Sequence, residues 1–320
     1  MRLTRSIIAA VACSLLASAA AAAPRILVVC RGDATLKAFD ATSYQPLFSV
    51  KLPGEPHEVA VSPDGRFAYT ADYLGLDNTV SIIDLEKQQR VADVNVKPSY
   101  KPHGFGITRD GTRLYVTCEA SRAVVELDPA ARSVRRTFAM RDYGAHLLTL
   151  SPDEKWIYAS SIIAGTVSFI NLETGELDRT VMSGQGCEGI AAAPDGSEIW
   201  SVNRLSQTIS VIKFNATRRD TTMSAVGNPI RIRFTHDGST AIVTCALTNQ
   251  LALFDREQRK ETGRVVVGDF PLVVEISPDG KRWFVTNNHA GSVSVVDAAT
   301  REQVSTFPAG ESPEGIVYIR

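Results

Sequence analysis

The 320-residue chain lacks the sequence features of several large protein classes. From residue 25 onward there is no apolar run long enough to cross a bilayer and no 3.6-residue apolar periodicity, which argues against membrane-spanning helices and helical bundles. The 34 basic and 35 acidic residues nearly cancel, so no overall positive field favours nucleic acid. We therefore expect no membrane span and no nucleic-acid partner.

Motifs that would assign a reaction directly are also absent. The chain has no G-x-S-x-G nucleophile elbow, no C-x-x-C-H haem attachment site, no glycine-rich phosphate loop and no H-E-x-x-H zinc helix. These absences leave open binding proteins and enzymes whose sites are assembled from distant parts of the chain.

The first 23 residues predict an export signal. Arg2 and Arg5 precede the apolar segment SIIAAVACSLLASAA, and Ala20-Ala21-Ala22 fits a small-residue cleavage site. We interpret residues 1–23 as a signal peptide and residues 24–320 as a mature protein that is periplasmic or secreted.

A block of about 42 residues recurs seven times in the remaining sequence. The copies open at Pro56, Pro102, Ala145, Cys187, Pro229, Pro271 and Pro313. Each full copy has four short β-rich runs separated by turn signals such as Ser62-Pro63-Asp64-Gly65. Four antiparallel strands in a repeat of this length form one propeller blade.

The two ends of the chain complete one blade between them. The last copy stops at Arg320 after a single strand, GIVYI, and the N-terminal runs RILVVC, ATLKAFD and QPLFSVKL supply the other three. The predicted fold is therefore all-β, a seven-bladed β-propeller with four antiparallel strands per blade and blade 1 closed by both termini. Residues 24–320 should form one domain, which we expect to be monomeric.

Export would place the cysteines in an oxidising compartment. Three of them stand at the same repeat position in blades 1, 3 and 6, which are not neighbours, and a disulfide needs Cα atoms within about 7 Å. We therefore predict free thiols at Cys30, Cys118, Cys187 and Cys245.

The repeat resembles two groups of known propellers. LYVTC, FVTNN and SVSVVD, with SPDG turns, are similar to the YVTN-type seven-bladed propellers over all seven blades. The blade 2 sequence EPHEVAVSPDGRFAYTADYLGLDNTVSIID resembles the lactonase-type propellers, through Pro56-His57 and Leu74-Gly75-Leu76-Asp77, and SVNRLSQTISVIKF in blade 5 is similar. The resemblance implies a seven-bladed ring and raises lactone hydrolysis or formation as an activity.

Histidines gather at one end of the predicted channel, which we call the top. The residue after each opening position lies at the mouth of the channel, on the innermost strand. In blade order these residues are Glu314, His57, His103, His146, Glu188, Ile230 and Leu272. Imidazoles from adjacent blades, with a carboxylate, can bind Zn, Cu or Fe(II). The predicted divalent transition-metal site is His57, His103, His146, Glu188 and Glu314.

Two other interpretations of these residues stay open. Polar side chains at a wet channel mouth can simply hydrogen-bond to neighbouring loops. Alternatively, His57, His103 and His146, with Glu188, can act as acid–base catalysts without a metal, because the pKa of imidazole lies near neutrality.

Further ligand-binding candidates come from a wider ring at the end of each second strand. This ring consists of Cys30, Asp72, Cys118, Ser161, Asn203, Cys245 and Asn287. Its acid and amide members, Asp72, Asn203 and Asn287, are predicted to bind ligand.

Charged residues are also predicted inside the channel. Arg231 and Arg233 alternate along the innermost strand of blade 6, and Glu275 stands level with Arg233 in blade 7. Because buried charges are costly unless paired, Arg233 and Glu275 should form a bridge. Arg231, whose evident partner is Glu58 across the channel, is predicted to hold a carboxylate or phosphate. Arg231, Arg233 and Glu58 thus join the ligand-binding candidates.

Three function classes follow. The preferred one is an exported propeller that binds a small molecule or metal ion, or docks an exported protein, at the top of its channel. The second is a lactonase-like enzyme with a histidine and a glutamate as acid–base pair. The third is an interaction scaffold with no small ligand.

Overall fold

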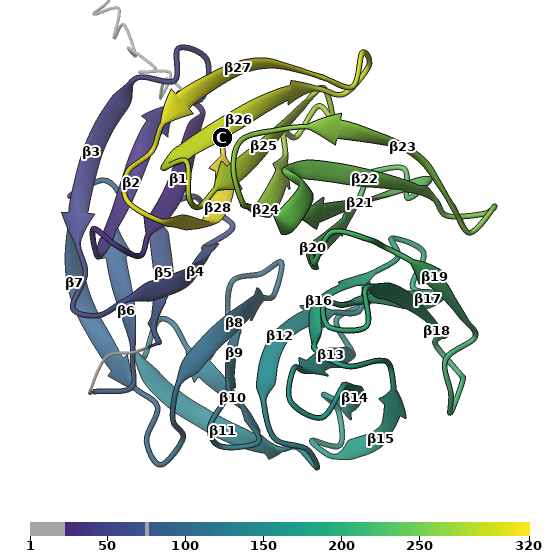
Figure 1. The fold of residues 1–320 in the computed structure, drawn as a ribbon. Helices are drawn as coiled ribbons and strands as arrows, with labels where there is room; N and C mark the ends of the chain where they lie inside the picture. The colour runs from purple at the N-terminus through teal and green to yellow at the C-terminus, as the bar shows by residue number, and fades with distance from the viewer. Residues whose placement is uncertain (1–22, 74–76) are drawn as a thin grey trace, which may run out of the picture.

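A computed structural model of the chain describes residues 23–73 and 77–320. In this part of the chain, 28 strands form seven antiparallel four-stranded sheets around a central axis, as Figure 1 shows. The predicted all-β seven-bladed propeller is confirmed. The predicted signal peptide lies outside the described residues, apart from residue 23. Across the described ranges, no helix is long and apolar enough to span a membrane.

The blades follow one another around the ring in chain order. From the innermost strand outward, blade 1 contains β28 (Pro313–Ile319), β1 (Arg25–Cys30), β2 (Thr35–Asp40) and β3 (Pro46–Lys51). Blade 2 contains β4 (Pro56–Val61), β5 (Phe67–Asp72), β6 (Thr79–Asp84) and β7 (Gln89–Asn95). Blade 3 contains β8 (Pro102–Ile107), β9 (Leu114–Cys118), β10 (Ala123–Asp128) and β11 (Ser133–Ala139). Blade 4 contains β12 (Ala145–Leu150), β13 (Trp156–Ser161), β14 (Thr166–Asn171) and β15 (Leu177–Met182).

The remaining three blades have the same plan. Blade 5 contains β16 (Cys187–Ala192), β17 (Glu198–Asn203), β18 (Thr208–Lys213) and β19 (Thr221–Ser224). Blade 6 contains β20 (Pro229–Phe234), β21 (Thr240–Cys245), β22 (Gln250–Asp255) and β23 (Lys260–Val266), with the 3₁₀ turn η1 (Ala246–Thr248) after β21. Blade 7 contains β24 (Pro271–Ile276), β25 (Arg282–Asn287), β26 (Ser292–Asp297) and β27 (Glu302–Pro308).

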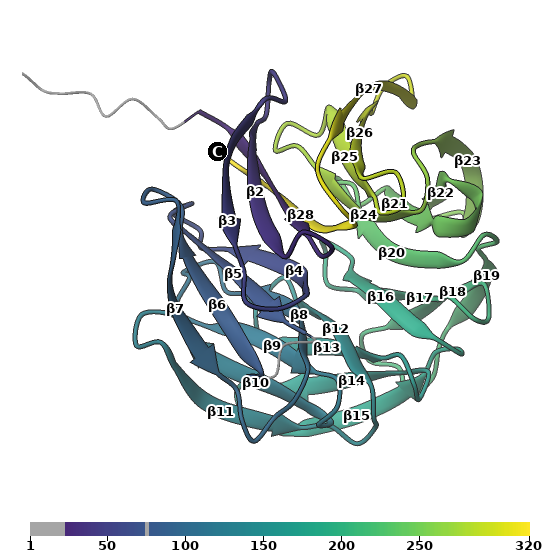
Figure 2. The same ribbon diagram turned by 60° about the vertical axis from the view of Figure 1, so that its left-hand side comes forward.

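The ring closes through the two termini, as the split repeat predicts. Strand β28 pairs antiparallel with β1, with Arg25 opposite Ile319 and Leu27 opposite Val317. Figure 2 shows the C-terminal strand lying beside the N-terminal strands of the same blade. This pairing gives β1 a partner on each side, and β28 becomes the innermost strand of blade 1, as β4 is in blade 2.

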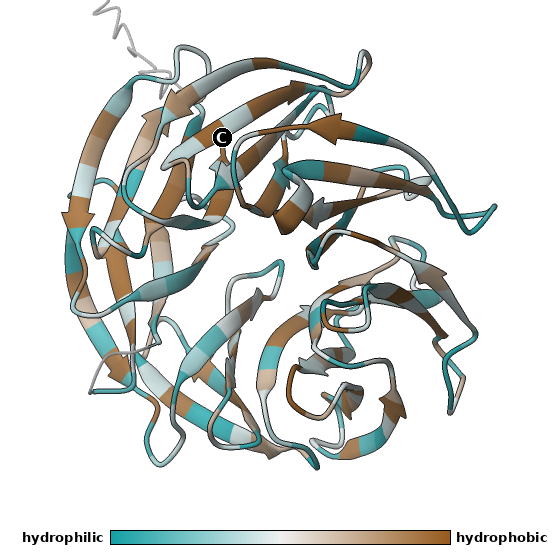
Figure 3. Cartoon of the chain, in the orientation of Figure 1, coloured by the Kyte–Doolittle hydropathy of each residue, from teal (hydrophilic) through white to brown (hydrophobic). Residues whose placement is uncertain are grey.

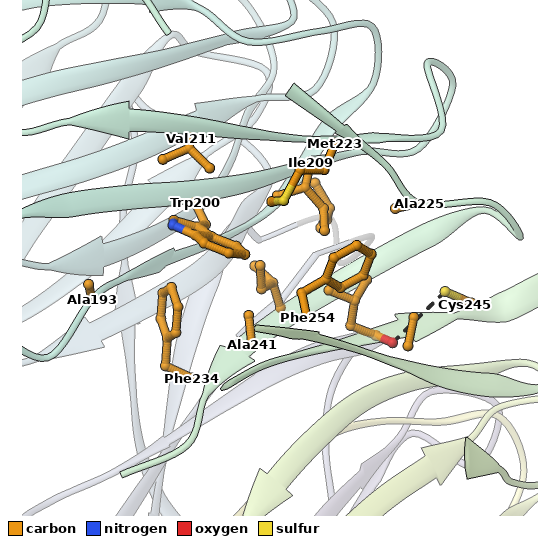
Figure 4. Close-up of a cluster of buried hydrophobic side chains, with 14 residues drawn as sticks. Ala193, Trp200, Ile209, Val211, Met223, Ala225, Phe234, Ala241, Cys245 and Phe254 are labelled. Carbon is orange, nitrogen blue, oxygen red and sulfur yellow. Dashed lines mark hydrogen bonds between the residues drawn. The ribbon is translucent and has the colours of Figure 1, made fainter. Parts of the chain in front are cut away.

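Apolar side chains fill the spaces between neighbouring blades. The strands show bands of hydrophobic residues alternating with polar ones in Figure 3. Between blades 5 and 6, Trp200 lies edge-on to Phe234, with ring centroids 5.2 Å apart, and Phe254 belongs to the same buried cluster (Figure 4). Because each blade buries apolar surface against both neighbours, the ring is held together mainly by packing between blades.

The four cysteines predicted to be free are free and fully buried. Burial raises the pKa of the Cys30 and Cys118 thiols to about 12, and that of Cys187 and Cys245 to about 11. Thiols with such pKa values stay protonated and are poor nucleophiles and poor metal ligands.

Each innermost strand has a β-bulge near its top end. In blade 2, Pro56 pairs with Asp72, but the next pair is Val59 with Thr70, so two residues of β4 have no partner on β5. The other six blades shift register at the same place. Bulges re-aim side chains, and in this fold they lie at the residues predicted to form the site.

Candidate functional site

The three histidines at the top of the channel lie together. His57 on β4, His103 on β8 and His146 on β12 form a row, with ring centroids 5.1 Å apart for the first pair and 4.1 Å for the second. The second pair is stacked. His103 and His146 are only 2% and 7% exposed, so this row is largely shielded from water.

Glu119 joins the row from the loop after β9. A carboxylate oxygen of Glu119 lies 2.8 Å from Nδ1 of His146, and Tyr73 donates a hydrogen bond of 2.9 Å to its other oxygen. The Tyr73 ring also contacts His57 and His103, with centroids 4.5 and 4.9 Å apart. Tyr73 thus links His57 and His103 to the carboxylate that His146 contacts directly.

The electrostatics of His146 and Glu119 reflect this contact. Burial opposes a charge on each and is the largest single effect, but the hydrogen bonds and opposite charges around them, their mutual contact foremost, together outweigh it. The pKa of Glu119 is therefore lowered and that of His146 is raised above 6.5. His103 differs, because burial and the positive groups around it hold its pKa well below 6.5. His103 is therefore neutral at physiological pH.

The other predicted carboxylates are already held in ion pairs. Glu314 lies 2.7 Å from Nδ1 of His57, and Arg31 lies 3.4 Å from its other oxygen. Glu188 is bound by Arg204 and Arg231, each at 3.1 Å, and lies 3.7 Å from Nε2 of His146.

Arg231 differs from its prediction. Glu58 lies across the channel at 2.6 Å, as expected, but Glu188 is a second partner at 3.1 Å. The sequence indicated Glu58 alone as a partner of Arg231, because the bulge that turns Glu188 toward the channel axis is visible only in the folded structure. Arg231 is thus held in a buried network rather than left unpaired for a ligand.

One imidazole nitrogen of each histidine lacks a hydrogen-bond partner. Nε2 of His57, Nδ1 of His103 and Nε2 of His146 are buried and find none among the described residues. Buried polar atoms without partners cost free energy, so three of them in one row point to a group that satisfies them.

The group of potential metal ligands shares His103 and His146 with the predicted five. Among the described residues, His103, Glu119 and His146 each offer a ligand atom, and these atoms lie within 4.8 Å of one another. His57, Glu188 and Glu314 surround this group but take part in the ion pairs described above. Glu119 is the ligand candidate that sequence reasoning missed.

The residues of the wider ring point into their own blades, and the residues that follow them in sequence face the histidines. Asp72, Asn203 and Asn287 are buried and hydrogen-bond within their own blades, to Thr79 and Ser81, to Thr208 and Ser210, and to Ser292 and Ser294. Their predicted ligand-binding role stays a prediction. The residues that reach the histidines and their carboxylates come one position later, because successive side chains of a strand point to opposite faces. They are Arg31, Tyr73, Glu119, Arg204 and Asn288.

The loop that follows Tyr73 carries the blade 2 resemblance. Within Leu74-Gly75-Leu76-Asp77, residues 74–76 lie outside the described residues. The exposed His289 stacks on Phe270 with ring centroids 4.0 Å apart.

A hydroxyl group near the end of β9 fixes the backbone of the next blade. Thr117 accepts a hydrogen bond from the bulge N–H of Gly104 at 2.8 Å and donates one to the carbonyl of His146 at 2.6 Å. Ser160, Thr244 and Thr286 do the same in blades 4, 6 and 7, and two of their acceptors are the carbonyls of Glu188 and Glu314. These hydrogen bonds position His146, Glu188 and Glu314 through their backbone carbonyl groups.

Glycine at the bulge permits the close approach of the blades. A Cβ atom on Gly104 would lie 2.7 Å from the carbonyl oxygen of His146, and one on Gly315 would lie 2.9 Å from that of His57. Both distances are too short for a real contact. The two glycines therefore set the spacing between adjacent blades at the histidines.

Deeper in the channel, Arg233 and Glu275 form the predicted bridge. Nη2 of Arg233 lies 2.7 Å from Oε2 of Glu275. The Glu275 side chain is 10% exposed, whereas that of Arg233 is 45% exposed. The pair is thus buried on its acidic side and open on its basic side.

Comparison with known proteins identifies the family of the chain and several structures with the same fold. Antigen Lp49 of Leptospira interrogans is 22% identical over 265 residues, which are 75% of this chain and 58% of that protein. The present chain therefore spans little more than half of that curated relative. Among solved structures, hydrazine synthase of Kuenenia stuttgartiensis superposes with a TM-score of 0.76 and 21% identity, covering 84% of this chain and 91% of the other.

A candidate 6-phosphogluconolactonase from Bacteroides fragilis superposes with a TM-score of 0.77 and 15% identity, covering 93% of this chain and 99% of the other. At these identities the likenesses show the fold alone. The sequence itself matches the family described as "Lactonase, 7-bladed beta-propeller" over residues 29–140 and 141–303, which are most of the chain. The chain therefore belongs to the seven-bladed β-propeller lactonase family.

Proposed function

We propose that this propeller binds a divalent transition metal ion at the top of its channel, through His103, His146 and Glu119. The observation that carries the proposal is the closeness of these three potential ligands beside buried imidazole nitrogens that have no described partner. Two imidazoles and a carboxylate suit Zn, Cu or Fe(II) and leave a coordination position open for a small molecule.

The charges around the histidines support a cation. Four glutamates and three arginines form this cluster: Glu58, Glu119, Glu188, Glu314, Arg31, Arg204 and Arg231. With neutral imidazoles the carboxylates outnumber the guanidinium groups by one, so a divalent cation would enter a site of negative net charge. The low pKa of His103 keeps that imidazole in the neutral form that metals require.

The proton on His146 competes with the metal. Because its contacts with Glu119 and Glu188 raise its pKa, metal affinity should fall as the pH is lowered, beginning at a higher pH than for an ordinary imidazole. In the preferred form of the proposal the protein is exported, since residues 1–23 resemble a signal peptide. The bound ion would then hold a small anionic ligand or a group of an exported partner protein.

Lactone hydrolysis or formation is the second candidate, favoured by the family match and by the pairing of His146 with Glu119. In this reading His146 would transfer a proton and Glu119 would orient its imidazole. The candidate needs no metal, so the two proposals predict different effects of chelation.

Elemental analysis of untagged protein tests the proposal. We expect close to one equivalent of Zn, Cu or Fe in the parent protein, loss of most of it in His103→Ala, and retention in His236→Ala, whose histidine lies on the opposite face of the ring. A metal-free parent that takes up none of these ions after dialysis against them would contradict the proposal. Turnover of a lactone by that metal-free protein would favour the second candidate.

A further inference from the structure

The channel contains a second site at its other end. A cavity of about 680 Å³ opens among the turns that join the first and second strands of blades 3 to 6. This volume is in the range of small-molecule sites. The cavity is lined by the lower halves of β8, β12, β16 and β20, and none of the three clustered histidines contributes to it.

The walls of this lower cavity are partly polar and partly apolar, and the polar share is the larger. Phe105, Leu148, Ile190 and Phe234 are among the residues that line it, one from each of the four blades. The apolar share suits a hydrocarbon or aromatic part of a ligand, because such a part gains free energy on leaving water. The polar share suits polar groups on the same ligand.

One arginine on an innermost strand belongs to this lining. Arg233 lines the cavity and is 45% exposed, and its one polar partner among the described residues is Glu275, which lies behind it and does not line the cavity. A guanidinium group has five N–H donors. The contact with Glu275 therefore leaves donors free to face the cavity.

The mouth of the cavity is also basic. Arg109 and His236 stand there, with Glu154 as the acidic residue of the lining. Arg109 is bound to Glu154 and to a backbone carbonyl on the exposed rim, whereas Arg233 lies on β20 in the wall of the cavity. A guanidinium fork of this kind binds carboxylate and sulfonate oxygens in pairs.

The lower cavity is separate from the histidine cluster. Arg231 stands two residues before Arg233 on the same strand, about 7 Å higher at the rise of a β-strand. Its ion pairs with Glu58 and Glu188 lie between the two sites. A ligand in the lower cavity would thus bind whether or not a metal occupies the top.

We propose that the lower cavity binds a small organic anion, a carboxylate or sulfonate with an apolar body, whose acidic group pairs with Arg233. The apolar side chains of the lining contact the body, and the free guanidinium donors select the charge. Glu275 positions Arg233 by holding its far side.

Fluorescence titration with 8-anilinonaphthalene-1-sulfonate tests this proposal, with uncharged N-phenyl-1-naphthylamine as the paired probe. We expect saturable binding of one sulfonate per protein, at least about tenfold tighter than the uncharged probe, since a charge-assisted hydrogen bond contributes about 1.5–3 kcal/mol. Arg233→Gln should remove that difference. Arg282→Gln is the matched control, because Arg282 is similarly exposed and paired with Asp297 outside the cavity.

Three further variants keep the test decisive. Arg233→Gln with Glu275→Gln removes both charges and avoids an unpaired buried carboxylate, and it should lose sulfonate binding while remaining folded by circular dichroism. Thr149→Phe, which fills the cavity from β12, should weaken both probes. His103→Ala should bind the sulfonate like the parent, so failure of the metal site leaves this result intact. Equal affinity of parent and Arg233→Gln, or of the two probes, would overturn the proposal.

Discussion

The hydroxyl of Thr117 donates a 2.6 Å hydrogen bond to the backbone carbonyl of His146 in the neighbouring blade. The same oxygen accepts the N–H of Gly104 in the bulge of its own blade. One side chain therefore joins two innermost strands at the level of the histidines. Because it bonds to main-chain groups, it sets the position of His146 without touching the imidazole.

Thr117→Val should both destabilise the fold and weaken metal binding. Valine keeps the shape but leaves the N–H of Gly104 and the carbonyl of His146 without partners, which should cost about 1–3 kcal/mol in urea unfolding. Thr244→Val is the control, since the hydroxyl of Thr244 makes the equivalent bonds to Arg231 and Leu272. We expect a similar stability loss there with metal affinity retained. An unchanged metal affinity in Thr117→Val would contradict the positioning role.

Asp72→Asn should stabilise the protein at neutral pH. Burial raises the pKa of Asp72 to about 6, so the folded state keeps its proton up to that pH while the unfolded chain releases it near 3.8. The stabilising contribution of Asp72 is therefore complete below about pH 4 and is lost as the pH rises through 6, a change of about 3 kcal/mol. Asparagine has no such proton to lose.

Blades 5 and 7 already have asparagine at the position that Asp72 occupies in blade 2. The amide groups of Asn203 and Asn287 donate hydrogen bonds to the hydroxyls of their blades, whereas in blade 2 Thr79 and Ser81 donate to Asp72. We expect Asp72→Asn to exceed the parent in urea stability at pH 7.5 and to match it below pH 4. The reciprocal Asn203→Asp should be destabilised at pH 7.5. A stability difference independent of pH would disprove this account of Asp72.

Arg231→Ala should destabilise the ring strongly. It leaves the buried carboxylates of Glu58 and Glu188 without a shared cation, which should cost on the order of 3 kcal/mol. Arg282→Ala, which removes a more exposed ion pair with Asp297, should cost less than about 1 kcal/mol. Urea unfolding of both variants measures the difference. Equal, small losses would mean that the Arg231 network is open to water.

Deleting residues 314–320 should open the ring. The deletion removes most of β28, so β1 loses its inner partner and blade 1 no longer packs against the channel. We expect a large fall in melting temperature and loss of a single cooperative transition, measured by calorimetry. A truncated protein that melts like the parent would refute closure by the two termini.

The sequence predicts the fold better than the site, for physical reasons. The repeat fixes the blade boundaries, and the leftover strands at the two ends, RILVVC and GIVYI, show how blade 1 is completed. The repeat also brings His57, His103 and His146 to equivalent positions in three adjacent blades. Equivalent positions on innermost strands meet at the axis of the ring.

The site residues that the sequence did not predict, such as Glu119, come directly after the second strands. Their side chains face the histidines because successive side chains of a strand point to opposite faces. Cys118 ends its strand pointing into the blade, so Glu119, the next residue, faces the histidines. The signal was present, because the residue after each second strand is polar in five blades, but the direction of a side chain where a strand gives way to a loop is settled only by the fold. Likewise, Thr117 in LYVTC looks like an ordinary strand residue until its partners in two blades are seen.

The most direct test of the metal proposal is a thermal melt of the untagged protein at pH 7.5 with and without added Zn²⁺, Cu²⁺, Fe²⁺ or Mn²⁺. A metal that binds the folded state raises the melting temperature by mass action. We predict a rise with at least one ion in the parent, loss of most of it in His103→Ala, His146→Ala and Glu119→Gln, and an unchanged rise in His236→Ala. No shift with any of the four ions in the parent, or the same shift in all the variants, would contradict a metal site at the top of the channel.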